Sequence, residues 1–417
     1  MAQLGALPAG CLGAMQWGGA TSEAHAHALL DLAVKERGVR MIDTAEVYPL
    51  PLSVETHGAS ERIVGAWLRA NPEWRARVVV ATKVAGPLRS SFLGAGRLPE
   101  HGFCAANVAS IAARQGGRAR SGLTRAEILA AAAASLARLG CGAIDLFDLH
   151  WPDRSVPLYG STQFDPRRAA AGRAEEPALG EMVAAVGELL ANGSVRAWGL
   201  SNENAYGVLA LCHEADRQGV RRPVALQNEL SLLNRHFEND SLAEACWRLG
   251  LRLVAYSPLA GGALTGKYVA SDEASRPSCG ASPASSCPQP PQAQAQAQAQ
   301  VLAHVQAQTQ TLPQPGAQGG RLAVPGKAAS RYNSPRVAAA VAAYQEAARS
   351  HGEASLAPAA LRWLLHRPCA PIVVVGASSP EQLADNLDAL CGPPLEPALA
   401  GAIDAIYLQH KDPVCWL

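Results

Sequence analysis

The stretch MIDTAEVY (residues 41–48) joins the end of a short apolar strand to two polar side chains. Met41 and Ile42 suit a buried strand, Asp43 ends it, and Tyr48 follows in the next loop. An aspartate after a strand is most often a turn or capping residue, about nine times in ten on the known habits of Asp in turns. The meaning of the stretch therefore depends on what the other strands end with.

Short β-branched, apolar runs alternate with amphipathic stretches along most of the chain. Strands that are apolar throughout and separated by helices indicate a parallel sheet covered on its outer face. Eight repeats predict an α/β fold, a (β/α)8 TIM barrel in a single domain. An open doubly wound sheet is the second choice, but the dinucleotide-binding motif G-x-G-x-x-G does not occur. The expected strands lie at about residues 10–13, 38–43, 77–83, 143–150, 195–201, 223–229, 251–257 and 371–378, and the expected helices within 22–38, 60–70, 123–140, 178–193, 204–219, 241–250, 334–352 and 379–390.

Several helix boundaries are marked by the sequence itself. Thr124 with Glu127 forms a capping box, and the pairs Ser334-Pro335 and Ser379-Pro380 place serine at the N-cap and proline at the first helical position. Glycine is the residue that most readily closes a helix in a left-handed conformation. We expect such ends at Gly38, Gly140, Gly193, Gly219 and Gly250.

Composition excludes several classes of function. The 417 residues contain 36 basic and 35 acidic side chains, a net charge of +1 that predicts no nucleic-acid or membrane partner. No apolar run approaches the roughly 20 residues of a spanning helix. With no targeting signal evident, the predicted location is the cytoplasm. The ten cysteines are scattered, without a CxxC pair, and are expected to be reduced thiols.

Residues 271–320 differ from the rest of the chain. They are rich in Ser, Pro, Ala and Gln, include the tract QAQAQAQAQ, and offer few side chains for a core. We predict a disordered insertion there, with residues 1–270 and 321–417 forming the barrel.

The remaining strands also end in polar residues. Lys83 ends the third, His150 the fourth, Ser201-Asn202 the fifth and Gln227 the sixth. In a (β/α)8 barrel these ends meet at one mouth, where active sites lie. A lysine charge beside Tyr48 would stabilise its phenolate and make the phenol a stronger acid, while Asp43 holds the lysine. His150 would orient a substrate oxygen, so the set suits proton delivery to a carbonyl that receives a hydride from a cofactor.

With these motifs in place, the chain resembles the aldo-keto reductases. The motifs are IDTAEVY, ATK, DLFDLHWPDR, WGLSNE, LQNELSLLNR, AYSPLAGGALTGKY and GASSPEQLADN, and they follow the family's order from residue 12 to residue 387. The segments YPLPLSVETHGASERIVGAWL and PLYGSTQFDP resemble the bacterial-type subgroup with a longer loop after the tyrosine. The family usually begins with a hairpin that plugs the barrel bottom, and only about ten residues precede the first strand here.

The resemblance implies a function and a residue set. It implies NADPH-dependent reduction of a small-molecule aldehyde or ketone to an alcohol, without a metal, by a catalytic tetrad of Asp43, Tyr48, Lys83 and His150. The cofactor NADPH/NADP+ would contact Ser201, Asn202, Gln227, Tyr256, Ser257, Leu259, Gly261, Lys267, Gly376, Ser378, Gln382 and Asn386, with Arg331 on its 2′-phosphate. Trp17, Trp151 and Tyr332 would line the substrate pocket.

Two other functions remain open on the sequence. A cofactor-binding, redox-sensing regulatory subunit with little turnover would keep the same fold, with the insertion facing its partner. A metal-dependent barrel hydrolase is a weaker alternative, because no H-x-H or carboxylate cluster stands at a strand end. The physiological substrate, the preference between NADPH and NADH, and the oligomeric state are left open.

Overall fold

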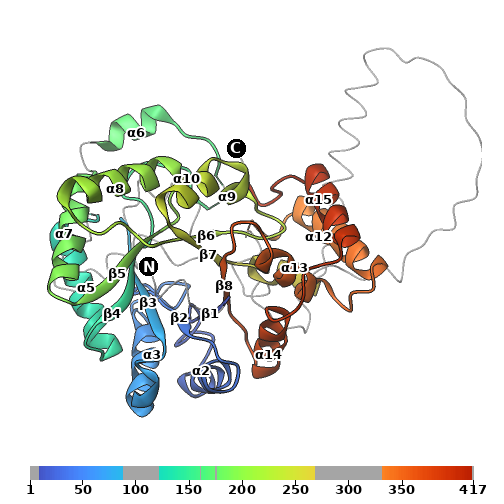
Figure 1. Cartoon of the computed structure of the whole chain (residues 1–417), viewed down its shortest axis with the longest axis horizontal. Coiled ribbons are helices and arrows are strands. Elements are labelled where there is room, and N and C mark those ends of the chain that lie inside the picture. Colours follow the sequence, from blue (N-terminus) through green and yellow to red (C-terminus); the bar gives the residue numbers. More distant parts are fainter. Residues whose placement is uncertain (1–8, 88–121, 160, 174–175, 268–330, 416–417) are drawn as a thin grey trace, which may run out of the picture.

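Eight parallel strands close into a barrel in the order of the sequence, from β1 to β8 (Figure 1). The computed structural model describes residues 9–87, 122–159, 161–173, 176–267 and 331–415. The barrel closes where β1 pairs with β8, with Gly10 opposite Val373 and Leu12 opposite Val375. The predicted (β/α)8 barrel is therefore confirmed. The strands are β1 (Gly10–Gly13), β2 (Met41–Asp43), β3 (Val79–Val84), β4 (Ile144–Leu149), β5 (Val195–Ser201), β6 (Ala225–Glu229), β7 (Arg252–Tyr256) and β8 (Ile372–Val375).

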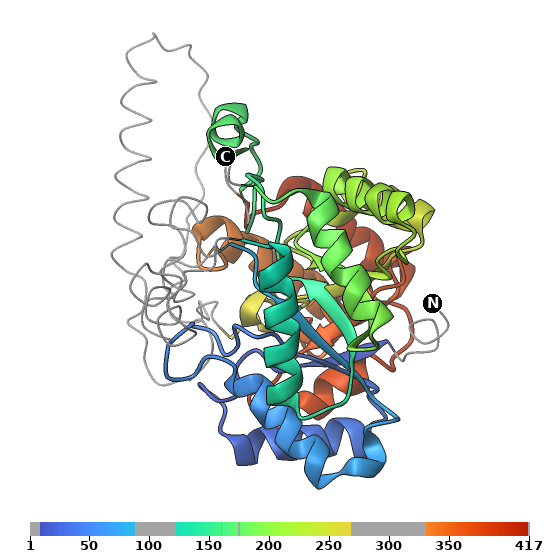
Figure 2. The ribbon, with the colours of Figure 1, turned by 90° about the vertical axis from the view of Figure 1, so that its left-hand side faces the viewer.

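Helices surround the strands, as Figure 1 and the view turned by 90° in Figure 2 show. Neighbouring helices of this outer layer pack on one another, as α3, α5, α7 and α8 do in succession. The helical segments are α2 (Glu23–Leu30), η1 (Asp31–Glu36), α3 (Ala59–Ala70), η2 (Pro72–Trp74), α5 (Arg125–Leu139), α6 (Pro166–Gly172), α7 (Leu179–Ala191), α8 (Ala205–Gln218), α9 (His236–Asn239), α10 (Leu242–Leu249), η5 (Ala260–Thr265), α12 (Pro335–Ser350), α13 (Leu356–Leu365), α14 (Pro380–Ala389) and α15 (Pro397–Gln409).

The predicted helix caps are present. The hydroxyl of Thr124 accepts a hydrogen bond from the Glu127 amide, and Ser334 and Ser379 cap α12 and α14 in the same way. Gly140, Gly219 and Gly250 end their helices in the left-handed conformation. Gly193 and Gly38 also have a left-handed backbone, with φ 80° and 71°, and each stands one residue after the cap of its helical segment, Asn192 for α7 and Arg37 for η1. Local sequence signals thus determine most of these boundaries.

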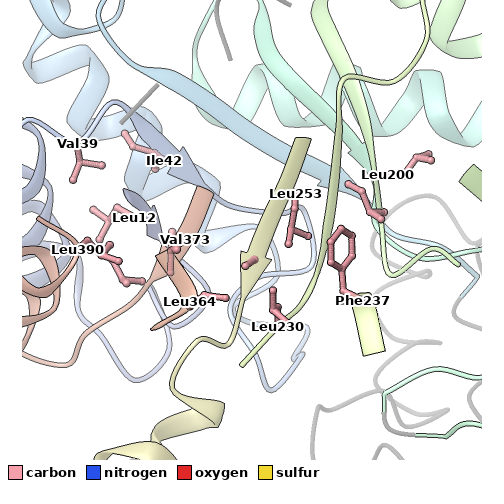
Figure 3. Packing of buried hydrophobic residues seen from close by; sticks show 14 of the residues in the cluster. Leu12, Val39, Ile42, Leu200, Leu230, Phe237, Leu253, Leu364, Val373 and Leu390 are labelled. Atoms are coloured by element: carbon pink, nitrogen blue, oxygen red, sulfur yellow. The ribbon is translucent and has the colours of Figure 1, made fainter. Parts of the chain in front are cut away.

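Side chains of the strands alternate between two apolar layers, because successive residues of a strand point to opposite faces. One set packs outward beneath the helices, and the other fills the barrel interior. Figure 3 shows part of the outer set, in which the strand residues Leu12, Ile42 and Val373 belong to the same cluster as Leu364 and Leu390 from the surrounding elements. The inner set consists of Cys11, Met41, Ala81, Leu146, Ala225, Val254, Ile372 and Val374.

Three further features bear on the sequence-based expectations. The predicted insertion at 271–320 lies outside the described residues, so its disorder stays a prediction. Within the described ranges, no helix is both long and apolar enough to cross a membrane. The described cysteines, such as Cys11 and Cys212, are free thiols.

Candidate active site

The polar side chains at the barrel mouth lie on the same strands and the same inward faces as the inner apolar residues, one step closer to the C-terminal ends of the strands. Asp43 stands two residues after Met41, Lys83 two after Ala81, Gln227 two after Ala225 and Tyr256 two after Val254. Because residues two apart share a face, each polar group lies above an apolar one on the same strand. The alternation therefore carries these side chains from several strands to one place.

Asp43 and Lys83 form a buried ion pair between β2 and β3. The Nζ atom of Lys83 donates to Oδ1 of Asp43 at 2.7 Å, to Oδ2 at 2.8 Å and to the backbone oxygen of Thr44 at 2.7 Å. Burial by itself would lower the pKa of Lys83, but the Asp43 carboxylate, followed by Tyr48 and Asp148, raises it above its ordinary value. The three ammonium hydrogens are all used, so the lysine is charged and fixed in place.

Tyr48 lies against this ion pair and against His150. Nζ of Lys83 is 5.0 Å from the centroid of the Tyr48 ring, within the range of a cation–π contact. The rings of Tyr48 and His150 are 5.7 Å apart and nearly perpendicular. Burial, with a smaller contribution from Lys83, holds the pKa of His150 well below its usual value, so the imidazole is neutral at pH 7. The four residues predicted as a tetrad are thus brought together.

A chain of hydrogen bonds links the tetrad to the β5–β7 side of the mouth. Tyr256 donates from its hydroxyl to Oδ1 of Asn202 at 2.7 Å, and Nδ2 of Asn202 donates to Oγ of Ser201 at 3.1 Å. Ser201 donates to the backbone oxygen of Gln227 at 2.9 Å, and Nε2 of Gln227 donates to Oδ1 of Asp43 at 2.8 Å. The four residues predicted to hold the nicotinamide are therefore connected by hydrogen bonds to the Asp43–Lys83 ion pair.

Several mouth loops contain non-glycine residues in the left-handed backbone region, and two of these residues directly follow a strand. Asn202 has φ 56° directly after β5, and Ser257 has φ 53° directly after β7. Asparagine tolerates this region, whereas serine adopts it less readily. Backbone strain of this kind persists where the surrounding structure holds it and is found disproportionately at functional sites.

A cavity of about 1320 Å³ opens at the mouth, large enough for a dinucleotide together with a small substrate. Asp43, Tyr48 and His150 line it, whereas Lys83 is fully buried and does not. The predicted substrate residues Trp17, Trp151 and Tyr332 also line it, as does every predicted cofactor residue: Ser201, Asn202, Gln227, Tyr256, Ser257, Leu259, Gly261, Lys267, Arg331, Gly376, Ser378, Gln382 and Asn386.

The donor set of the cavity fits a nicotinamide dinucleotide. The ring face of Tyr256 suits the aromatic ring of a nicotinamide, and the side-chain amides of Asn202 and Gln227 suit its carboxamide. At the other end, α14 begins with Ser379 as its N-cap, and Ser378 donates from its hydroxyl to Gln382 at 2.8 Å. Exposed backbone amides and the dipole of a helix N-terminus favour a phosphate group. These residues remain predicted contacts.

Arg331 already has partners in the structure. Its Nη2 atom donates to Oε2 of Glu229 and, at 2.8 Å, to the hydroxyl of Tyr332. Tyr332 in turn donates to Oε1 of Glu229 at 2.8 Å. The arginine charge is thus compensated by a carboxylate of β6, and a role on the cofactor 2′-phosphate stays a prediction.

Two residues of this region were missed by the sequence analysis. Tyr159, in the loop after β4, lines the cavity with φ 54°. Asp148 lies inside the barrel, where burial raises its pKa to about 8, an effect that the Lys83 ammonium opposes and the Asp43 carboxylate increases. Asp148 has the same strand parity as Leu146 and His150, which is the signal that identifies it as inward-facing.

Comparisons with known proteins agree with this geometry. A model of the aldo/keto reductase family matches residues 11–408. Protein tas of Escherichia coli is 32% identical over 406 residues, covering 96% of this chain and 94% of that protein. Aflatoxin B1 aldehyde reductase member 4 of Homo sapiens is 28% identical over 415 residues, covering 98% and 97%. A putative voltage-gated potassium channel subunit beta of Schizosaccharomyces pombe is 30% identical over 233 residues, covering 55% and 52%. Because the family match runs from the first strand into the last helix, the chain belongs to the aldo/keto reductases, a family of NAD(P)H-dependent carbonyl oxidoreductases.

Proposed function

We propose that this protein is an NADPH-dependent reductase that converts an aldehyde or ketone to the alcohol, with Tyr48 as the general acid. The observation that carries the proposal is the buried Asp43–Lys83 pair with its ammonium 5.0 Å from the Tyr48 ring. The family membership supports the reaction class. The choice of NADPH and the role of the tyrosine belong to the proposal.

Lys83 has a defined task in this mechanism. The carbonyl oxygen takes a proton from Tyr48 as the alcohol forms, which leaves a phenolate beside the ammonium. The positive charge stabilises that phenolate, and Asp43 keeps the ammonium charged and oriented through two hydrogen bonds. NADPH, when bound, supplies the hydride. In alcohol oxidation the phenolate of Tyr48 takes the proton back.

His150 serves as a neutral group that orients the substrate. Its ring meets Tyr48 edge-on, and its Nδ1 atom is buried without a hydrogen-bond partner among the described residues. A neutral imidazole can donate one hydrogen bond without adding a second positive charge beside Lys83. It would therefore hold the carbonyl oxygen near the Tyr48 hydroxyl.

The test is NADPH consumption with a panel of aldehydes, ketones and quinones. Tyr48→Phe removes only the phenolic oxygen, and we expect kcat/KM to fall by at least about 100-fold, the usual contribution of a general acid. Tyr206→Phe is the matched control, because Tyr206 is an exposed residue on α8 outside the cavity. Equal rates for wild type and Tyr48→Phe would overturn the assignment.

A second candidate is a cofactor-binding, redox-sensing regulatory subunit with little turnover. The observation in its favour is the 30% identity to the putative potassium channel subunit beta over about half of each chain. It predicts tight NADPH binding, no substrate in the panel with useful turnover, and a co-purifying partner that is lost when residues 271–320 are deleted. Turnover that is unaffected by this deletion would favour the reductase.

A further inference from the structure

Asp148 is a buried carboxyl group beside the tetrad that the mechanism above does not use. On β4 it lies directly opposite Lys83 of β3 on one side and Gly199 of β5 on the other. Its side chain is 1% exposed, and its Oδ1 atom has no hydrogen-bond partner among the described residues. An unpaired buried carboxylate is costly, so this group needs an explanation.

The barrel makes room for the Asp148 carboxyl on β5. A Cβ atom at residue 199 would lie 2.3 Å from Oδ1 of Asp148, closer than two such atoms can approach. The carboxyl therefore occupies the space that a side chain on β5 would otherwise fill. The absence of a side chain at Gly199 is therefore what leaves room for the Asp148 carboxyl inside the barrel.

The charges around Asp148 do not balance when it is ionised. Among the residues that the structure describes, Lys83 is the cation that faces it, while Asp43 from β2 is a second carboxylate and Cys11 from β1 is a buried thiol. Gly199 on β5 brings no charge, and the inner residues of β6, β7 and β8 nearest this level are neutral. Lys83 donates its three ammonium hydrogens to Asp43 and to the backbone oxygen of Thr44, so it donates no hydrogen bond to Asp148. Two carboxylates sharing one desolvated cation favour the protonated form of the less well bonded one.

We propose that Asp148 is a positioning residue that tunes Tyr48 through Lys83: its carboxyl group is protonated in the working reductase, and its ionisation weakens proton donation. The inference rests on the proposed function. When Asp148 is neutral, the Lys83 charge is available to stabilise the phenolate that Tyr48 becomes. When Asp148 is ionised, its negative charge offsets part of that field, and the phenolate costs more to form.

The first test is the pH profile of kcat in carbonyl reduction with wild type, Asp148→Asn and Asp148→Leu. Burial raises the pKa of Asp148 to about 8, so the wild-type rate should fall through this region. Both variants lack the titrating group. For each protein we compare kcat above the pKa of Asp148 with kcat below it. This ratio should be about threefold to tenfold larger in the two variants than in wild type.

Asp145→Asn is the matched control. Asp145 is also a buried carboxyl of β4, but it has the opposite strand parity and is paired with Arg75 at 2.7 Å. Its variant should keep the wild-type alkaline fall. If Asp148→Asn and Asp148→Leu keep that fall as well, or lose the same fraction of activity at every pH, the proposal is overturned.

The second test does not depend on turnover. Infrared difference spectroscopy of the full chain should show the carbonyl stretch of a buried protonated carboxyl below pH 8. This band should disappear as the pH rises and be absent from Asp148→Asn. Absence of the band from wild type overturns the inference about Asp148 but leaves the reductase proposal standing. If the band is present but the protein reduces no carbonyl substrate, the reductase proposal alone is overturned.

Discussion

At the barrel mouth β2 and β3 hold a buried ion pair, whereas the hydrogen-bonded groups that reach this pair from the β5–β7 side are neutral hydroxyls and amides. Asp43 and Lys83 compensate each other at 2.7 Å on the first side. Ser201, Asn202 and Gln227 carry a chain of hydrogen bonds on the second. A fixed charge in a dry site is the strongest means of stabilising charge that develops during a reaction, while neutral donors hold a ligand without a large desolvation cost. The division predicts that damage to the first side affects rate and stability, and damage to the second affects binding.

Lys83→Met should produce the largest effect. It removes the charge that stabilises the Tyr48 phenolate and leaves Asp43 buried without its cation. We expect kcat/KM to fall by about 1,000-fold and the free energy of unfolding to fall by about 3–5 kcal/mol. Steady-state kinetics and urea denaturation measure the two effects.

A double variant separates these two consequences. Adding Asp43→Asn to Lys83→Met removes the uncompensated carboxylate, so most of the stability should return while the activity stays low. Activity of Lys83→Met within about tenfold of wild type would contradict the view that the ionic side drives the reaction.

Asp148→Asn should change how stability depends on pH. The pKa of Asp148 is about 8 in the folded protein and near about 4 in an unfolded chain. Between these values the folded protein binds one proton more than the unfolded chain, so the stability contributed by this site falls as pH rises and levels off above pH 8. The variant lacks this loss, and its stability relative to wild type should increase by about 3–4 kcal/mol from pH 5 to pH 8. Urea denaturation at several pH values measures it, and a difference independent of pH would contradict it.

Gln227→Leu tests the neutral side. The variant loses a donor to Asp43 and the predicted contact with the nicotinamide carboxamide. Since Lys83 still bonds both Asp43 oxygens, kcat should change less than affinity, and the Kd for NADPH should rise about tenfold, the value of one good hydrogen bond. Fluorescence titration measures the Kd. Asn228→Leu, on the opposite strand parity, is the control, and an unchanged Kd for Gln227→Leu would remove Gln227 from the site.

Lys267→Ala should have the smallest effect. Lys267 is an exposed residue of the cavity wall and is predicted to lie near the pyrophosphate. Its loss should raise the Kd for NADPH about threefold at low salt, and the difference should shrink at high salt because exposed charges are screened. Lys411→Ala, another exposed lysine outside the cavity, should show no change. A salt-independent loss with Lys267→Ala would indicate a role other than charge attraction.

Much of the site follows from the sequence once the barrel is recognised. The end of each strand is visible as the point where an apolar run turns polar, and all such ends of a parallel barrel share one mouth. This is why Asp43, Tyr48, Lys83 and His150 could be grouped from residues more than 100 positions apart. The motifs then allowed the cofactor residues to be named, and all of them line the cavity.

Two contacts could not be predicted, because each joins groups that are distant in the chain. Arg331 and Glu229 are 102 residues apart, and no local pattern marks their pairing. Asp148 stands opposite Lys83 and Gly199 only because the strands of the barrel meet in one particular register. A strand's own alternation shows which way a side chain points but not which neighbour it meets.

The sequence by itself determined the order of strands and helices, most helix caps and the residue types at the mouth, because these depend on local periodicity and on neighbours along the chain. Only the tertiary structure decided that Lys83 lies beneath the cavity rather than in its wall, that Gln227 supports Asp43, and that Asp148 shares the buried lysine. The physical reason is that closing the barrel sets the stagger between strands. That stagger decides which inward side chains lie at the same level and which charges interact in the dry interior.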